Sequence, residues 1–298
     1  MGLEISSSAL RLVALSTRAG KTVLLSAHTT DLPAGVVSAA YSSLNILRPD
    51  EFASIVRDGL SSLLPVRSRR TALSLPDGIF RVQTLEFDQL PGRPTERERL
   101  IRWRLEKAAF DVSESCLRYQ ILGRPNAGYT VLACFAKQAV IAQYASLLSD
   151  AGLEPWSIGL SSFHTLNFYA PQLQKKSDRY ALAQVSDDAF TTIITENGGV
   201  RFYRHKELKR GSGPEVSARI IKELEDSFHF YTHRDRTKET EVEQLYLTGT
   251  SQVIPSLAGE LAAMPSFNVE VLSPTTIYPE AGNAGPEMAS ALGARGEA

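Results

Sequence analysis

Residues 2–15 read GLEISSSALRLVAL, and this stretch decides the fold. Apolar runs on either side of the serines predict two short strands, and the three serines predict a tight turn between them. KTVLLSAH at residues 21–28 predicts a third strand. Because short turns rich in serine and glycine are one way in which proteins hold a phosphate, the stretch raises the question of whether this chain binds a nucleotide.

The same pattern returns in the second half of the chain. Residues 180–208 read YALAQVSDDAFTTIITENGGVRFYRHKEL, which predicts strand, Ser/Asp turn, strand, Asn-Gly turn and strand. Glu4 and Gln184 then hold equivalent places about 180 residues apart. This spacing indicates a duplication at the scale of a domain.

Composition excludes several classes of protein. The chain has 298 residues, of which 43% are hydrophobic and 22% charged, which is ordinary for a globular protein of two or more domains. A net charge of -1 gives no case for binding nucleic acid or an acidic membrane surface. Cys116 and Cys134 lack metal-type spacing, so reduced thiols are expected. We expect no secretory signal and no membrane span, so a membrane role would require a partner.

Residues 81–152 predict a compact β-α-β-β-α insert. Its clearest helix is expected at residues 95–109, where Thr95 and Glu98 have the spacing of a capping box. A second helix is expected at residues 138–151, with Gly152 at its C-terminal cap. Further helices are expected after residue 49 and at residues 214–232, and residues 153–169 predict a strand leading into a helix.

The order of these elements resembles the actin-like ATPase fold, and within it the PilM-type proteins of type IV pilus assembly and their relative, the cytoplasmic part of GspL from type II secretion. GLEISSSALRLVAL is similar to the family's GLDIGSSSVKLVEL, and LYLTGTSQVIPSL at residues 245–257 is similar to IYLTGGGALLPGL. Residues 100–123 resemble AIRWEAEKYIPFPLEEVVLDYQVLG, with these matches: Trp103, Glu106, Lys107, Tyr119, Gln120 and Gly123. The resemblance spans nearly the whole chain.

This resemblance implies an actin-like (ribonuclease H-like) α/β fold of two domains with a small insert. The first domain would comprise residues 1–80 and 153–180, with residues 284–298 added to it. The insert would comprise residues 81–152, and a reduced second domain residues 181–283.

An actin-like ATPase needs particular residues at three turns. Glycines let backbone N–H groups approach the phosphates, and one aspartate in each hairpin orients metal-bound or attacking water. By the resemblance, Glu4 stands for the first aspartate, whereas Gln184 at the second is neutral and can serve neither as an anionic metal ligand nor as a general base. The implied nucleotide site is therefore vestigial, and its residues are Glu4, Ser6, Ser7, Ser8, Gln184, Ser186, Gly249, Thr250 and Ser251.

Other changes point the same way. Asp187 and Asp188 place carboxylates where phosphate oxygens would lie, and these repel phosphate unless a metal intervenes. Thr250 and Ser251 replace glycines that follow Gly249 in the family. A subdomain that walls the family's cleft is missing, because VRFYRHKELKRGSGPE at residues 200–215 passes almost directly into the next helix. We expect no catalytic residue, no metal site and no cofactor, with weak binding of ATP and Mg²⁺ left open as the alternative, and the three serines leave a small anion site open.

The resemblance implies a cytoplasmic scaffold that binds the N-terminal tail of an inner-membrane, PilN-like partner in a groove between the first domain and the insert. The expected groove residues are Arg81, Gln83, Trp103 and Lys107. The chain would then lie at the inner face of the inner membrane, held there by its partner.

Three alternatives stay open. An active ATPase or small-molecule kinase of the same fold would need an acidic residue in place of Gln184. An actin-like cell-division protein would need a C-terminal amphipathic membrane helix, for which residues 285–298 have too few large apolar side chains. The cytoplasmic half of a secretion protein would be distinguished by its gene neighbourhood.

Other motifs give weaker evidence for a functional site. His229 and His233 have helical spacing without an evident third ligand, so no metal site is expected. GLSSF at residues 159–163 does not match G-x-S-x-G, so Ser161 and His164 give no case for a hydrolase. The basic stretch RFYRHKELKR at residues 201–210 fits a solvated strand face better than a surface for an acidic partner.

Overall fold

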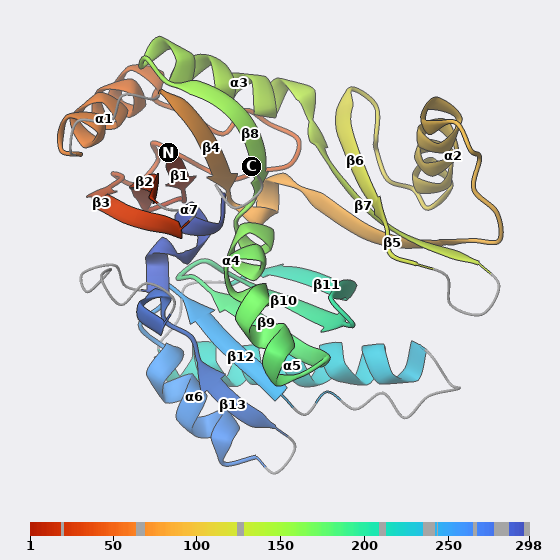
Figure 1. The fold of residues 1–298 in the computed structure, drawn as a ribbon. Helices are drawn as coiled ribbons and strands as arrows, with labels where there is room; N and C mark the ends of the chain where they lie inside the picture. The colour runs from red at the N-terminus through yellow and green to blue at the C-terminus, as the bar shows by residue number, and fades with distance from the viewer. Residues whose placement is uncertain are drawn as a thin grey trace.

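We describe the protein from a computed structural model that defines residues 1–18, 21–63, 69–123, 128–208, 213–234, 242, 244–264, 267–276 and 286–294. The described chain forms three β-sheets with helices around and between them (Figure 1). Two of these sheets have five strands each and the third has three. None of the described helices is long and apolar enough to cross a membrane.

The first five-stranded sheet is built around the serine-rich hairpin and has the order β3-β2-β1-β4-β8. β1 pairs antiparallel with β2 and parallel with β4, which in turn pairs parallel with β8. Helices α1 and α3 lie on one side of this sheet, and α4 and α7 lie on the other (Figure 1). The bounds are β1 Gly2–Ile5, β2 Ala9–Arg18, β3 Lys21–Asp31, α1 Pro49–Ser61, β4 Arg70–Leu75, α3 Gln138–Asp150, β8 Glu154–Leu160, α4 Ser161–Lys176 and α7 Ala289–Ala294.

The second five-stranded sheet repeats this plan, with the order β11-β10-β9-β12-β13. β9 pairs antiparallel with β10 and parallel with β12, as β1 does with β2 and β4. Helices α5 and α6 pack on this sheet, and α4 contacts both β8 and β9, which places it between the two sheets (Figure 1). The bounds are β9 Arg179–Val185, β10 Ala189–Glu196, β11 Gly199–Glu207, α5 Gly213–Arg234, β12 Gln244–Gly249, α6 Ile254–Ala262 and β13 Asn268–Val271.

The two hairpin turns match atom for atom in their backbone bonds. The N–H of Ser6 donates to the Ala9 carbonyl at 2.9 Å, and the N–H of Ser186 donates to the Ala189 carbonyl at 2.8 Å. In both turns the serine hydroxyl also caps the alanine N–H, at 2.9 Å and 3.1 Å. The duplication seen in the sequence is therefore present in the fold.

The insert sheet has the order β5-β7-β6, with α2 against one face. Alternation along the strands turns Leu85, Leu117 and Phe135 toward Ile101 and Leu105 of α2, and these residues form a separate apolar cluster. The bounds are β5 Arg81–Phe87, α2 Pro94–Lys107, β6 Ser115–Ile121 and β7 Tyr129–Lys137. Figure 1 shows this unit extending sideways from the body that contains the two larger sheets.

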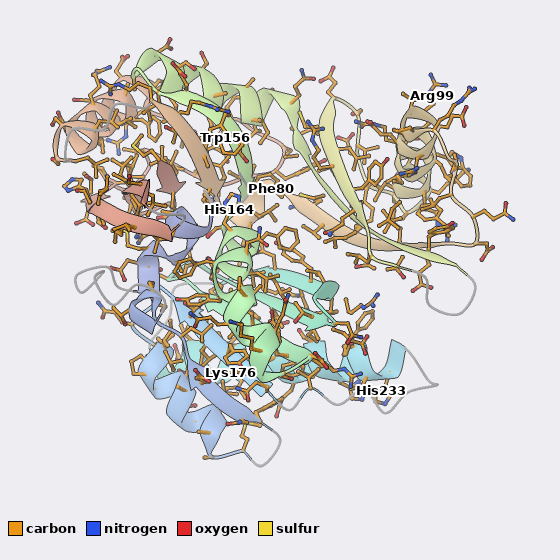
Figure 2. All side chains as sticks on the ribbon, in the orientation of Figure 1. Phe80, Arg99, Trp156, His164, Lys176 and His233 are labelled. Carbon is orange, nitrogen blue, oxygen red and sulfur yellow. The ribbon has the colours of Figure 1, made fainter. Side chains whose placement is uncertain are left out.

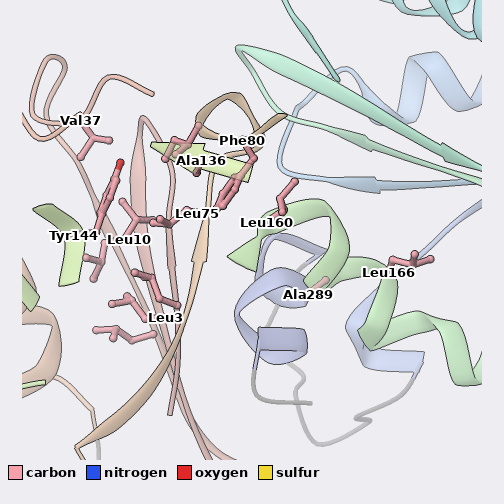
Figure 3. Packing of buried hydrophobic residues seen from close by; sticks show 14 of the residues in the cluster. Leu3, Leu10, Val37, Leu75, Phe80, Ala136, Tyr144, Leu160, Leu166 and Ala289 are labelled. Carbon is pink, nitrogen blue, oxygen red and sulfur yellow. The ribbon is translucent and has the colours of Figure 1, made fainter. Parts of the chain in front are cut away.

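The largest apolar cluster runs from the first sheet into the insert and the second sheet. It joins Leu3 and Leu75 of the first sheet to Phe80 and Ala136 at the base of the insert, with Tyr144 of α3 against them (Figure 3). All of these side chains are buried. Burial of large apolar side chains, at about 25 cal/mol per Å², is what holds these units together.

Local signals were right at two turns and wrong at one helix. Gly152 and the pair Asn197 and Gly198 have positive φ angles of 87°, 51° and 75°, as a helix end and a two-residue hairpin turn require. The capping box at Thr95 is incorrect, because α2 begins at Pro94, with Arg93 as its N-cap and no side-chain cap bond. Proline lacks an N–H and has a preset φ, so it occupies the first helical position and leaves Thr95 inside the helix.

Candidate functional site

A cavity of about 350 Å³ lies where the two five-stranded sheets face each other. It is lined by both serine-containing hairpin turns, by residues 76–78 after β4, by Ser161 and by the turn after β12. The structure thus brings together the residues that the sequence predicted as one vestigial site. Ser251 is not in the lining, and its N–H instead donates to the Val185 carbonyl at 3.2 Å. The predicted residues that do line the cavity are Glu4, Ser6, Ser7, Ser8, Gln184, Ser186, Gly249 and Thr250.

Glu4 sits at the end of β1 and is buried with Arg11. Their charged atoms, Oε2 and Nη1, are 3.4 Å apart. Burial raises the pKa of the Glu4 carboxyl, and the neighbouring Arg11 charge and the Ser161 and Ser290 hydroxyls only partly offset that rise. Glu4 is thus committed to internal partners and does not present a free anion to the cavity.

A single hydroxyl connects the two hairpins at their base. Gln184 Nε2 donates to Ser161 Oγ at 2.7 Å, and Ser161 Oγ donates to Glu4 Oε1 at 3.3 Å. Ser161 is the first residue of α4, directly after β8. The amide of Gln184 therefore works as a donor in a chain of bonds that ends at Arg11.

The hairpin tips also meet. The Ser7 hydroxyl donates to Oδ2 of Asp188, while Oδ1 of the same carboxylate accepts from the Ser186 hydroxyl at 2.9 Å. Asp187 beside it is exposed. This bond joins the tips of the two turns directly.

The third turn approaches β9 closely. Gly249 has a φ of 130°, and a Cβ on it would lie 2.0 Å from the Val185 carbonyl oxygen. The Thr250 N–H donates to this same oxygen at 2.9 Å. The surviving glycine thus has a structural reason that is independent of any phosphate.

A second buried carboxylate, Asp77, joins the parts of the molecule and was not foreseen. It follows β4 and accepts the N–H of Ser162 at 3.1 Å, the hydroxyl of Thr191 at 2.8 Å and that of Tyr203 at 3.1 Å. His205 Nδ1 lies 2.9 Å from Thr191 Oγ1. Burial, followed by the nearby Asp77 charge, raises the pKa of Tyr203 well above its usual value. Asp77 thus ties the first sheet to two strands of the second.

These residues match a metal-bound triphosphate poorly. The cavity is lined by the carboxylates of Asp77, Asp187, Asp188 and Glu207, whereas the buried guanidinium of Arg11 is paired with Glu4. Within the described ranges, no group of three or more His, Cys, Asp or Glu side chains is arranged to hold a metal ion. The site as it stands is suited to hydrogen bonding between its own two halves.

The predicted partner residues fall into two pairs. Arg81 and Gln83 lie on the same face of β5, opposite Phe135 and Ala133 of β7. Trp103 and Lys107 lie one helical turn apart on α2, with the ammonium 6.0 Å from the centre of the indole ring. The side chain of Trp103 is 50% exposed.

Tyr41 joins the pair of Arg81 and Gln83 to the body of the molecule. The sequence did not predict this role. The guanidinium of Arg81 lies 4.5 Å from the centre of its ring. The Tyr41 hydroxyl donates to the Asp111 carbonyl at 2.6 Å, and its ring packs edge-on against Phe135. Lys137 completes this joint by pairing with the Asp111 carboxylate at 2.6 Å.

The loop that carries Tyr41 is rigidly held. The buried Asn45 side chain donates to the carbonyls of Ala40 and Ser43 at 2.8 Å and 2.7 Å. Gln143 of α3 accepts the Asn45 N–H at 2.8 Å and donates to the Ile46 carbonyl at 2.9 Å. Tyr41 is therefore presented to the insert in a fixed position.

The remaining motifs have ordinary structural roles. Arg204 and Lys206 of the basic stretch pair with Glu223 of α5 at 2.9 Å and 3.7 Å, so part of its charge is neutralised inside the protein. His229 and His233 stack with ring centres 3.9 Å apart on α5, and His233 lies near its end (Figure 2). His164 is buried in α4 between the sheets (Figure 2).

Asp77 and Ser161 could have been found from the strand order. They follow β4 and β8, which run parallel to β1, and the carboxyl ends of parallel strands meet at one edge of a sheet. Glu4 lies next to the last residue of β1, at that same edge. The pattern within each single strand does not show that these three strand ends are adjacent.

Comparison with known proteins establishes the fold. No protein-family model matches the chain, and no curated protein sequence matches it. A chain of a "PilM-PilN type IV pilus biogenesis complex" matches with a TM-score of 0.83 and 22% identity, over 99% of this chain and 97% of that one. A protein with an actin-like ATPase fold from Bacteroides thetaiotaomicron matches with a TM-score of 0.56 and 13% identity, over 99% and 94%. The ethanolamine utilization protein EutJ from Carboxydothermus hydrogenoformans matches with a TM-score of 0.50 and 10% identity, over 98% and 87%. The chain therefore has the actin-like fold that the sequence predicted.

Proposed function

We propose that this chain is a cytoplasmic scaffold of a type IV pilus or type II secretion assembly platform. In this role it binds the N-terminal tail of a PilN-like inner-membrane partner and does not hydrolyse ATP. The observation that carries the proposal is the similarity in fold, over 99% of the chain, to a chain of a complex that pairs PilM with PilN. The chain would lie at the inner face of the inner membrane through that partner.

The joint around Tyr41 supports a peptide groove between the first domain and the insert. An exposed arginine stacked on a tyrosine ring at 4.5 Å offers charge and an aromatic surface in one place. Arginine, tyrosine and tryptophan are the residues most often found at binding hot spots. Trp103 on α2 provides a second exposed aromatic in the insert. We therefore place the tail along Arg81 and Gln83, with Trp103 and Lys107 as its outer contacts.

Three features of the cavity support a scaffold without turnover. Gln184 has no carboxylate to activate water, Glu4 is held by Arg11 and Ser161, and the tips of the hairpins are bonded to each other. Phosphoryl transfer depends on positioned metal ions and a positioned nucleophile. In the described part of the chain, no group of three or more His, Cys, Asp or Glu side chains is arranged to hold a metal ion, and the neutral Gln184 cannot act as a general base.

Binding can be tested with a synthetic peptide of the cytoplasmic tail of the inner-membrane protein encoded beside this chain. Fluorescence anisotropy should give saturable binding that weakens about ten-fold or more in Arg81→Ala and Trp103→Ala. The matched controls are Arg57→Ala, at an exposed position of α1, and Trp156→Ala on β8, where the side chain is 38% exposed. Equal losses in targets and controls, or no binding at all, would contradict the groove.

Turnover is tested separately. Phosphate release from Mg-ATP should stay at the rate of a protein-free blank, and calorimetry with Mg-ATP should give no tight binding. Turnover would favour the alternative of an active ATPase or small-molecule kinase. Such a result would leave the peptide experiment unaffected.

A further inference from the structure

The two five-stranded sheets are linked across the cavity by side chains at three levels. At the tips, Ser7 of the first hairpin donates to Asp188 of the second. At the base, Gln184 donates to Ser161 at 2.7 Å, and Ser161 donates to Glu4 at 3.3 Å. Both links join the two hairpins of the duplicated motif, one directly and one through Ser161 of α4.

The third level is the buried carboxylate of Asp77. It accepts hydroxyl bonds from Thr191 of β10 and Tyr203 of β11, at 2.8 Å and 3.1 Å. Since Asp77 follows β4 of the first sheet, both bonds cross between the sheets. The N–H of Ser162 supplies a third bond and fixes the carboxylate from the side of α4.

Proteins with two lobes around a cavity commonly close on a ligand that bonds to both lobes. Here the bonds between the lobes come from the chain itself. We infer that the links Ser7–Asp188, Gln184–Ser161–Glu4 and Thr191/Tyr203–Asp77 form a built-in clasp that holds the two sheets in the closed arrangement without a bridging ligand. The clasp is independent of any partner tail, because none of its residues lies in the groove assigned to that tail.

The chemistry of the clasp fits this role. A hydrogen bond from a hydroxyl to a carboxylate is stronger than one between neutral groups. Separating a buried carboxylate from its three donors therefore costs much free energy. In the first hairpin, Ser8 lies next to Ser7 but is turned to solvent. In the second, Asp187 lies next to Asp188 and is likewise exposed. The neighbours therefore provide matched controls of the same residue type.

The test is a double-mutant cycle read by hydrogen–deuterium exchange of the full chain. Ser7→Ala and Asp188→Ala should each speed exchange at the cavity-lining amides of residues 184–191 and 77–78 by about ten-fold. The double variant should show no more increase than Asp188→Ala alone, because that variant has already lost the bond from Ser7 together with the one from Ser186. Small-angle scattering should show a larger radius of gyration in the same variants.

Ser8→Ala, Asp187→Ala and their combination should exchange within about two-fold of the parent chain. The clasp is wrong if the Ser7 and Asp188 variants match these controls, or if their effects multiply in the double variant. Gln184→Ala provides a second, independent opening at the base and should show the same segments exchanging faster. Since Ser7 and Asp188 are at the surface, loss of the whole fold does not obscure the result, and circular dichroism checks this.

Discussion

Gln184 and Glu4 hold equivalent positions in the two hairpins and are joined through one hydroxyl, that of Ser161. The arrangement needs an N–H donor at position 184, since the hydroxyl hydrogen is already given to Glu4. A carboxylate there would supply no donor when ionised, and it would bring a second negative charge close to the first. The neutral side chain of Gln184 is therefore suited to the hydrogen bonds that run through Ser161 to Glu4.

We expect Gln184→Glu to lower the free energy of unfolding by about 2 kcal/mol at pH 7. Burial and the Glu4 charge would raise the folded pKa of the new carboxyl above its unfolded value of about 4.3. Stability should thus match the parent below that value and be lost as pH rises through the folded pKa. Urea denaturation across pH measures this, with Gln120→Glu on exposed β6 as control; a loss that is the same at every pH would contradict the account.

Asp77→Asn should destabilise the protein by about 3 kcal/mol, because an NH2 group replaces one carboxylate oxygen and leaves at least one of the three donors facing another donor. Thermal and urea denaturation would measure the loss. Asp187→Asn, the same change at an exposed site in the cavity rim, should have little effect. A similar midpoint for both variants would show that Asp77 does not hold the sheets together.

Gly249→Ala should cost at least about 3 kcal/mol, since its new methyl group would meet the Val185 carbonyl. The comparison is Gly259→Ala in α6, where nothing lies within 4 Å of the added carbon. That variant should gain up to about 1 kcal/mol from helix propensity. The opposite order of stabilities in urea would refute the close approach of the third turn to β9.

The hydrogen bonds from Lys137 and Ser113 lower the pKa of Asp111 to about 2. The stabilisation from this ionised group is present above its unfolded pKa and is lost as pH falls toward 2. In Lys137→Met the Asp111 pKa should rise toward its ordinary value of 3.8, as read from the side-chain carboxyl by NMR. Lys176→Met, which removes the amine that pairs with Glu270, should leave Asp111 unchanged.

Much of the fold was accessible from the sequence because the hairpins are locally encoded. Ser8 and Asp188 occupy the same place in the two turns, and each carbonyl accepts a leucine N–H, from Leu32 at 2.8 Å and Leu208 at 2.7 Å. Short strands, turn residues and the repeated order sufficed to align them. The gathering of the predicted cavity residues followed from that alignment.

The functional residues that the sequence did not predict are brought together by contacts between distant parts of the chain. Asp77 and Ser161 lie 73 and 157 positions from Glu4 along the chain, and only the parallel strand order brings them to it. Tyr41 was missed because its loop has no periodic pattern. The division into domains stays a prediction, and the capping box failed because a neighbouring proline took precedence in starting the helix.

The short helix α7 has a consequence for how the molecule is made. It packs so closely on its neighbours that a Cβ on Gly2 of β1 would lie 1.9 Å from the Ala291 carbonyl oxygen, and one on Gly293 would lie 1.8 Å from the carbonyl oxygen of His164 in α4. A sheet whose first strand begins at residue 2 is thus completed by residues 289–294, far along the chain. Until residues 289–294 are synthesised, the apolar surface of β1 and β4 that α7 covers stays exposed, and the nascent protein must be shielded from aggregation there by other means.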